Sequence, residues 1–347
     1  MTSTIFKRTF LYLLGKMSQL DSKRYLQNLS ENFVFDPKRK RIIKRKYPFQ
    51  ILIYHRVLPV YDPFAIDVTT SRSFEEQIRH LSSYFKIMSL EDLVDDLLAG
   101  KQIRNALCIT FDDGYFDNYL YAFPILKKYN VPATIFLTTD YISSKNVLWF
   151  DKVLLFLKNT GINQIDLGIS NGRLIDLGSL EKRIAAVEPV LEHIKTLNKS
   201  EMNNIISYME KNTRKNINLE PNRMMNWEEI KEMSESGIYF GSHTRSHAIL
   251  SKISSDEIWR EISESKTIIE EKINKEVKSF AYPNGQINDF NDDCIKQLIK
   301  ADYKCAVSTL RGNNYSNTDR FQLRRIAPWD EDPVSFLGRV ILYRLMD

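Results

Sequence analysis

From residue 49 onward, short apolar runs alternate with stretches in which apolar residues recur at helical spacing. The short runs predict strands at 49–57, 106–114, 131–139, 238–244, 277–285 and 303–309. The helical spacing predicts helices at 73–85, 89–100, 118–130, 227–237, 254–274 and 292–301. Polar residues stand at the ends of several of these strands. Repeated strand–helix units of this kind predict a parallel α/β barrel, whose chemistry lies at the C-terminal ends of its strands.

Local signals set the expected ends of some helices. Ser73 and Ser89 each precede a helical pattern and are expected as N-caps. Gly100 closes the second of these helices. Pro124 falls inside the pattern at 118–130 and is expected to break that helix.

The strand–helix rhythm is interrupted once. A mostly helical stretch at about 145–225 is expected to be an insertion over one face of a barrel that spans 48–330. Residues 331–347 are expected to form a C-terminal helix.

The N-terminal 47 residues differ in charge from the rest of the chain. They hold twelve Lys and Arg residues against three acidic residues, although the whole chain has a net charge of +5. Apolar and basic positions between Ile5 and Lys16 predict an amphipathic helix. Such a helix would lie on an anionic membrane surface; the alternatives are a helix packed on the protein's own body and a frayed terminus. The basic run at 38–46 is typical of a solvated linker.

The composition excludes several classes of protein. The 347 residues are 43% hydrophobic and 27% charged, as in a globular protein. No uncharged apolar run reaches the roughly 20 residues of a membrane span. The three cysteines form no CxxC pair, which indicates a reduced compartment. The basic residues are not spread along the chain as in a nucleic-acid-binding domain.

The apolar stretch FLYLLG is too short for a secretory signal. We therefore expect a cytoplasmic protein, with peripheral contact to the inner membrane through residues 1–20.

Two carboxylates close the predicted strand ALCITF. Asp112 and Asp113 are adjacent, and side chains alternate along a strand, so the two carboxylates point in different directions. One of them can bind a metal while the other faces a water molecule. The alternative is turn chemistry, because an Asp-Asp-Gly sequence also favours a loop.

His243 and His247 form an H-x-x-x-H pair at the end of another predicted strand. If this segment turns helically, imidazoles four residues apart converge on one ion; otherwise they are ordinary buried or surface histidines. Together with a strand-end aspartate they form a three-ligand site that leaves positions open for water and substrate.

These motifs occur in a specific order along the chain. ITFDDGY (109–115), SHTRSH (242–247) and FAYPNG (280–285) resemble the first three motifs of the polysaccharide deacetylases, the NodB-homology proteins of carbohydrate esterase family 4. The resemblance covers about residues 48–330. It implies a deformed (β/α)7-type barrel and the metal-dependent removal of acetyl groups from sugars.

The resemblance assigns a role to each motif residue. Asp113, His243 and His247 resemble the metal ligands, and Asp112 resembles the general base that takes a proton from the attacking water. The backbone N–H of Asn284 resembles the donor that holds the oxyanion.

Two family features are absent from their usual places. Ala281 stands where the family has an arginine that orients the base, and no histidine follows His247 to act as a C-terminal acid. His55, at the end of the first core strand, resembles the acid of the circularly permuted poly-N-acetylglucosamine deacetylases; the alternative is a histidine that caps a buried strand. Arg324 or Arg325 is expected to replace the missing arginine.

Aromatic residues near the motifs are further candidates. Tyr115 and Tyr282 are expected to border the substrate pocket. Three tryptophans, with Asp151 beside the first of them, are candidates for stacking on sugar rings, and core packing is the alternative: Trp149, Trp227 and Trp329.

The resemblance implies one divalent metal ion, zinc foremost, with cobalt, nickel and manganese as alternatives. It implies N-deacetylation of an amino sugar in a polysaccharide or in a lipid-linked or nucleotide-linked precursor. The alternatives are an amidohydrolase that acts on a non-sugar amide and a catalytically silent glycan-binding barrel.

Overall fold

Parallel strands form the centre of the molecule. The computed structural model describes residues 33–36, 41–44, 48–168, 174–213, 223–327 and 330–345. In spatial order the central strands are β3 (Gln50–Tyr54), β7 (Ala106–Phe111), β8 (Thr134–Leu137), β11 (Tyr239–Ser242), β12 (Ser279–Ala281), β13 (Cys305–Arg311) and β14 (Leu323–Arg325). Each neighbouring pair runs parallel.

The ring closes between the last strand and the first. Ile326, directly after β14, exchanges backbone hydrogen bonds with Ile51 and Ile53 of β3 at 2.9 and 3.1 Å. A further strand, β6 (Lys86–Met88), pairs with the start of β7. The expected deformed (β/α)7-type barrel is therefore confirmed.

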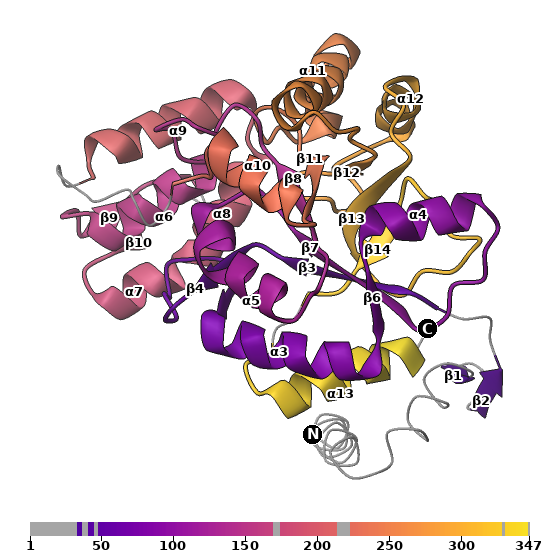
Figure 1. Ribbon diagram of the computed structural model, residues 1–347. Helices are drawn as coiled ribbons and strands as arrows, with labels where there is room; N and C mark the ends of the chain where they lie inside the picture. The colour runs from indigo at the N-terminus through magenta and orange to yellow at the C-terminus, as the bar shows by residue number, and fades with distance from the viewer. Residues whose placement is uncertain are drawn as a thin grey trace.

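The sequence explains why these strands are central. Every residue of β3, β7 and β8 is buried, as expected for parallel strands covered on both faces. Amphipathic helices cover the outside of the ring (Figure 1). They are α3 (Ser71–Tyr84), α4 (Leu90–Leu98), α5 (Phe123–Lys128), α10 (Trp227–Glu235), α11 (Ser255–Ile273), α12 (Asp292–Lys300) and α13 (Pro333–Leu345).

Three local expectations are corrected by the structure. Helix α3 begins earlier than expected: its N-cap is Thr70, whose hydroxyl accepts the backbone N–H of Ser73 at 3.2 Å. The strand expected at 49–57 is interrupted at His55, after which β4 (Arg56–Leu58) pairs with β5 (Val68–Thr70). Pro124 does not break a helix: a π-helical turn (Asn118–Ala122) ends just before α5, and Pro124 lies in the first turn of α5, where the missing N–H of a proline costs no hydrogen bond.

The mostly helical insertion lies between β8 and α10. It contains α6 (Trp149–Asn159), α7 (Leu180–Ala185), α8 (Val187–Thr196) and α9 (Lys199–Lys211), with the short antiparallel pair β9 (Gln164–Ile165) and β10 (Ile175–Asp176). Figure 1 shows these elements gathered on one side of the barrel.

Some expectations fall on residues that the structure does not describe. Of residues 1–47, it describes the backbone of two short strands, β1 (Phe33–Asp36) and β2 (Arg41–Lys44), which pair antiparallel. The expected amphipathic helix, its membrane contact and Trp329 lie outside the described residues. Among the described helices, none has the length and hydropathy needed to cross a membrane.

Candidate metal centre and active site

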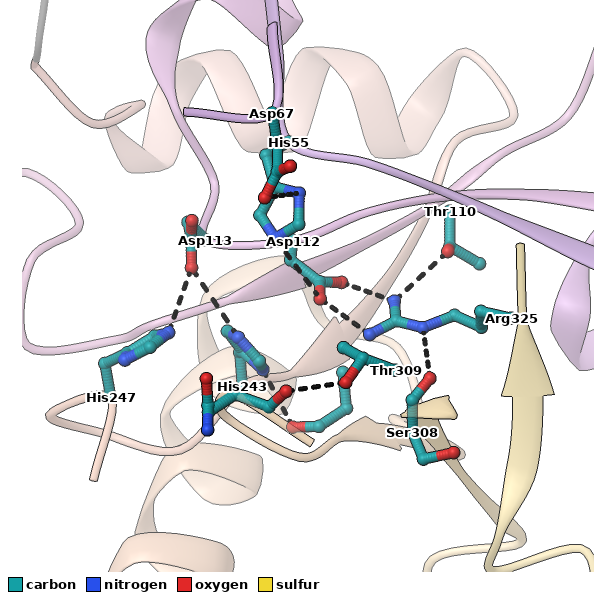
Figure 2. A network of polar contacts seen from close by, with 12 residues as sticks. His55, Asp67, Thr110, Asp112, Asp113, His243, His247, Ser308, Thr309 and Arg325 are labelled. Carbon is teal, nitrogen blue, oxygen red and sulfur yellow. Dashed lines mark hydrogen bonds and ion pairs between the residues drawn. The ribbon is translucent and has the colours of Figure 1, made fainter. Parts of the chain in front are cut away.

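The end of β7 turns two adjacent carboxylates in different directions. The backbone N–H of Asp112 still pairs with the Tyr54 carbonyl of β3 at 3.0 Å, so this residue keeps its place beside the strand. Asp113 then adopts a φ of 75° and leaves the strand direction. Gly114 follows at a φ of 89°, and a Cβ there would meet the Leu137 side chain at 2.8 Å. As a result, Asp113 faces two histidines and Asp112 faces Arg325 (Figure 2).

Three side chains converge as a candidate metal site. Oδ1 of Asp113 lies 3.4 Å from Nε2 of His247 and 3.6 Å from Nε2 of His243. One potential ligand atom from each residue lies within 4.8 Å of the other two. The structure thus brings together the Asp-His-His set that the sequence motifs predict.

The two histidines converge without a helix, which corrects one expectation. His243 follows β11 directly, and the segment through His247 is irregular, with Thr244 at a φ of 66° and His247 at 60°. A carboxylate of helix α11 holds this loop: Oε2 of Glu261 accepts the backbone N–H groups of Arg245 and Ser246 at 2.8 and 2.9 Å. Two residues with left-handed backbone and the Glu261 carboxylate thus bring the two imidazoles together without a helical turn.

The donor atoms fit a divalent cation. Oδ1 of Asp113 is buried and has no hydrogen-bond partner among the described residues, which is costly for a carboxylate oxygen unless a cation binds it. The Nδ1 of His243 lies 2.8 Å from the carbonyl oxygen of Ala281 and must donate to it, which leaves Nε2 with a free electron pair toward Asp113. Burial lowers the pKa of His243 to about 4, against the opposing charge of Asp112, so the imidazole is neutral as a metal ligand must be.

Asp112 is held by an arginine from the far side of the ring. Nη1 and Nη2 of Arg325 donate to Oδ1 and Oδ2 of Asp112, each at 2.7 Å. The Nε of Arg325 donates to the Ser308 carbonyl at 2.9 Å, which fixes the plane of the guanidinium (Figure 2). Burial alone would raise the pKa of Asp112, but the charge of Arg325 and the nearby His243 hold it well below its usual range. Asp112 is therefore ionised at neutral pH.

The structure distinguishes between the two candidate arginines. Side chains alternate along β14, so Arg325 is buried inside the ring and Arg324 is exposed outside it. Arg325 thus pairs with Asp112, the role expected of the arginine that Ala281 replaces in the third motif.

His55 lies at the open side of the same carboxylate. Its Nε2 is 3.9 Å from Oδ2 of Asp112, and its Nδ1 is 3.7 Å from Oδ2 of Asp67. The imidazole is 24% exposed, whereas the Asp112 carboxylate is 2% exposed. His55 therefore stands between the buried carboxylate and the solvent-accessible cavity. The sequence did not identify Asp67 as a site residue, because it stands in an irregular loop that contains no recognisable motif.

A cavity of about 980 Å³ opens over these residues. Its walls include the insertion helix α8, the loop that joins β4 and β5, and the C-terminal end of β13. Of the pocket residues expected from the sequence, three line it: Tyr115, Asn284 and Arg325.

Tyr282 was expected in this pocket, and the structure contradicts that expectation. The ring is 1% exposed and stacks on Phe290, with ring centroids 4.0 Å apart. Its hydroxyl donates to the Phe321 carbonyl at 3.0 Å. Tyr282 does not line the cavity because it points into the packing between the strands and α12.

Asn284 follows β12 in a left-handed conformation with a φ of 60°. Its side-chain amide donates to Asp289 at 2.6 Å, and its carbonyl accepts the Thr309 hydroxyl at 2.7 Å. These bonds fix the orientation of the peptide that carries the expected oxyanion donor.

Two of the three candidate tryptophans lie among the described residues, and both are partly buried against the hydrophobic core. Trp149 lines the cavity. Trp227 is partly buried against the hydrophobic core and does not line it.

Comparisons with known proteins agree with this geometry. A sequence model of the polysaccharide deacetylases matches residues 99–165 and 187–306, which is more than half of the chain. The poly-beta-1,6-N-acetyl-D-glucosamine N-deacetylase of Staphylococcus epidermidis is 30% identical over 187 residues, which cover 52% of this chain and 62% of that protein. The Staphylococcus aureus MRSA252 protein of the same name is 29% identical over 183 residues, 51% and 61% of the two chains. The match thus spans less than two thirds of these relatives.

Two solved structures share the fold. The deacetylase PplD of Streptococcus pyogenes superposes with a TM-score of 0.56 at 20% identity, over 84% of this chain and 98% of that one. IcaB from Ammonifex degensii superposes with a TM-score of 0.55 at 17% identity, over 86% and 98% of the two chains.

Proposed function

Because the chain belongs to the polysaccharide deacetylase family, we propose that it is a metal-dependent hydrolase that removes N-acetyl groups from the amino sugars of a glycan. The observation that carries this proposal is the placement of an ionised, oriented carboxylate, Asp112, beside the Asp113–His243–His247 site in one cavity.

Each residue of the site has a task in amide hydrolysis. A divalent cation held by Asp113, His243 and His247 supplies Lewis-acid chemistry, which makes water a nucleophile near neutral pH and polarises a carbonyl. Asp112 accepts the proton that the attacking water loses. His55 donates a proton to the departing amine, since its imidazole reaches the cavity while Asp67 faces its other nitrogen. The backbone N–H of Asn284 is the proposed oxyanion donor.

Zinc is the proposed metal, because two imidazoles and one carboxylate are a common ligand set of catalytic zinc. Cobalt, nickel and manganese also bind such donors, so the ion must be identified in the isolated protein.

We propose poly-β-1,6-N-acetylglucosamine, or a precursor with the same acetamido sugar, as the substrate. The support is the activity for which the staphylococcal relatives are named, and these relatives match about half of this chain. The cytoplasmic location and the contact of residues 1–20 with the inner membrane stay predictions, and cell fractionation tests them directly.

The test is acetate release from N-acetylglucosamine oligomers with β-1,6 and β-1,4 linkages. The protein is chelated, then reloaded with zinc, cobalt, nickel or manganese in separate samples. We expect release that depends on the metal, favours the β-1,6 oligomer and is lost in Asp112→Asn. A fully metal-loaded wild type that releases no acetate from either oligomer would overturn the proposal and leave a silent glycan-binding barrel or an amidohydrolase for other amides.

A further inference from the structure

The insertion begins with a helical turn that faces the metal site. The first three residues of α6 are Trp149, Phe150 and Asp151, and all three line the cavity. Further along α6, the side chains of Val153, Phe156 and Leu157 are buried in the hydrophobic core instead. The first turn of α6 is thus turned toward the cavity, while the rest of the helix supports it.

Aromatic rings connect this turn to a proposed metal ligand. The Phe150 ring meets the His247 imidazole edge to face, with centroids 5.3 Å apart and planes at 68°. The Trp149 ring meets Phe150 in the same manner, with centroids 5.5 Å apart and planes at 85°. Only one ring therefore separates the indole of Trp149 from His247.

Asp151 adds a buried polar group to the same wall. It stands at the third position of α6, where a carboxylate commonly caps the helix, yet its Oδ2 accepts the hydroxyl of Tyr115 at 2.8 Å. The side chain is 2% exposed, and burial raises its pKa to about 7. Tyr115 is fixed in turn by Arg56, whose guanidinium lies 4.3 Å from the centre of the tyrosine ring. A buried carboxyl costs stability, and this one is among the residues that line the cavity.

We propose that the first turn of α6 is a sugar-binding platform, in which Trp149 packs on the apolar face of the pyranose that carries the acetamido group and Asp151 accepts one of its hydroxyls. This inference rests on the proposed function for the identity of the sugar. The platform thus assigns a role to the first turn of the insertion between β8 and α10. Phe150 and Tyr115 hold the two binding residues in place.

The test measures binding separately from turnover. Metal-free protein is titrated with an N-acetylglucosamine tetramer and followed by calorimetry, so that no hydrolysis occurs. We expect Trp149→Ala to weaken binding about tenfold, the order that a lost aromatic contact gives, and Trp149→Phe to keep most of it. Asp151→Leu is expected to weaken binding by a similar factor and Asp151→Asn less, because an amide oxygen still accepts a hydrogen bond.

Trp227→Leu is the matched control, since Trp227 also begins a helix and is partly buried but does not line the cavity. Metal content after reloading and the midpoint of thermal unfolding show whether each variant is intact. Unchanged binding in an intact Trp149→Ala variant would overturn the inference, as would an equal loss in Trp227→Leu. Acetate release by the reloaded wild type is scored independently: binding that depends on Trp149 without any release would retain the platform and remove the proposed function.

Discussion

Arg325 and Asp112 are 213 positions apart in the sequence and are joined by two parallel hydrogen bonds of 2.7 Å. Arg325 ends β14, the last strand of the ring, and Asp112 follows β7. Closure of the barrel therefore brings the guanidinium to the carboxylate. Charge-assisted bidentate pairs of this kind fix orientation as well as charge. Asp112 is consequently ionised and held in one direction before any substrate arrives.

The first prediction follows from this pair. In Arg325→Gln the opposing charge is lost while burial remains, so the pKa of Asp112 rises. The base is then protonated at higher pH than in the wild type, and the acidic limb of the profile of kcat/KM against pH moves to higher pH. We expect kcat to fall about 10- to 100-fold at neutral pH, the same order as when a hydrogen-bond partner that orients a metal ligand is removed.

Arg324→Gln is the control for this variant, because Arg324 is the neighbouring arginine and lies exposed on the other face of β14. Its profile should match that of the wild type. An acidic limb that stays in place in Arg325→Gln would show that Arg325 does not tune the base.

The second prediction concerns metal binding and stability. A cation that binds the folded chain alone raises the free energy of unfolding, by about 2.7 kcal/mol when its concentration is 100 times its dissociation constant. We expect zinc to raise the thermal midpoint of the chelated wild type and to leave that of His247→Ala nearly unchanged. Differential scanning calorimetry with and without zinc measures both values.

His193→Ala serves as the control, since His193 lies on α8 away from the three ligands. A zinc-induced shift that persists in full in His247→Ala would argue against the assigned ligand set.

The sequence predicted the barrel because periodicity and buried strands are local properties. Residues 106–111 and 254–274, for example, form β7 and α11 nearly as expected. It also predicted the metal ligands, because their residue types and order are specific. The helical turn considered for their convergence is absent: the backbone of His247 is left-handed, and Glu261 of helix α11 holds the preceding residues Arg245 and Ser246, a contact that no sequence spacing reveals.

Long-range contacts account for the remaining differences. The choice between Arg324 and Arg325 depended on which face of β14 points inward, and that register is set only when the ring closes on β3. Tyr282 was assigned to the pocket because it belongs to the FAYPNG motif, but its ring packs against Phe290 and does not line the cavity. Asp67 reaches His55 from a loop whose path depends on the pairing of β4 with β5.

The third prediction separates the proposed acid from the base. An amine leaves poorly unless it is protonated, whereas 4-nitrophenolate leaves readily without a proton. We therefore expect His55→Gln to lower kcat for N-acetylglucosamine oligomers by about 10²- to 10⁴-fold, the usual contribution of a general acid. Hydrolysis of 4-nitrophenyl acetate by the same variant should change much less. Asp112→Asn should impair both reactions, since both need the attacking water to lose a proton. Equal losses on both substrates in His55→Gln would remove His55 from the acid role.

The last prediction concerns a carboxyl at the opposite end of the barrel. Glu91 of α4 is buried and accepts hydroxyl groups from Thr134 at 2.7 Å and Ser279 at 2.6 Å, the first residues of β8 and β12. Burial raises its pKa above the usual value of 4.5. Between these two pKa values the folded state keeps a proton that the unfolded chain has lost. The unfolded state then binds fewer protons, so the free energy of unfolding falls as pH rises through this window.

Glu91→Gln carries no ionisable proton and should not show this fall. The difference in the free energy of unfolding between the variant and the wild type should therefore shift in favour of the variant as pH rises above about 4.5, by about 1.4 kcal/mol for each unit by which the folded pKa is raised. Urea unfolding at pH 5 and pH 8 measures this change. Asp95→Asn removes an exposed carboxylate of the same helix that pairs with Lys278 at 2.7 Å, and it is the control for losing a carboxyl group outside the core. A difference that is equal at the two pH values would mean that Glu91 ionises in the fold as it does in the unfolded chain. Because Glu91 lies at the N-terminal end of the strands and the candidate metal site at their C-terminal ends, acetate release by the variant, measured as in the test of the proposed function, should match that of the wild type.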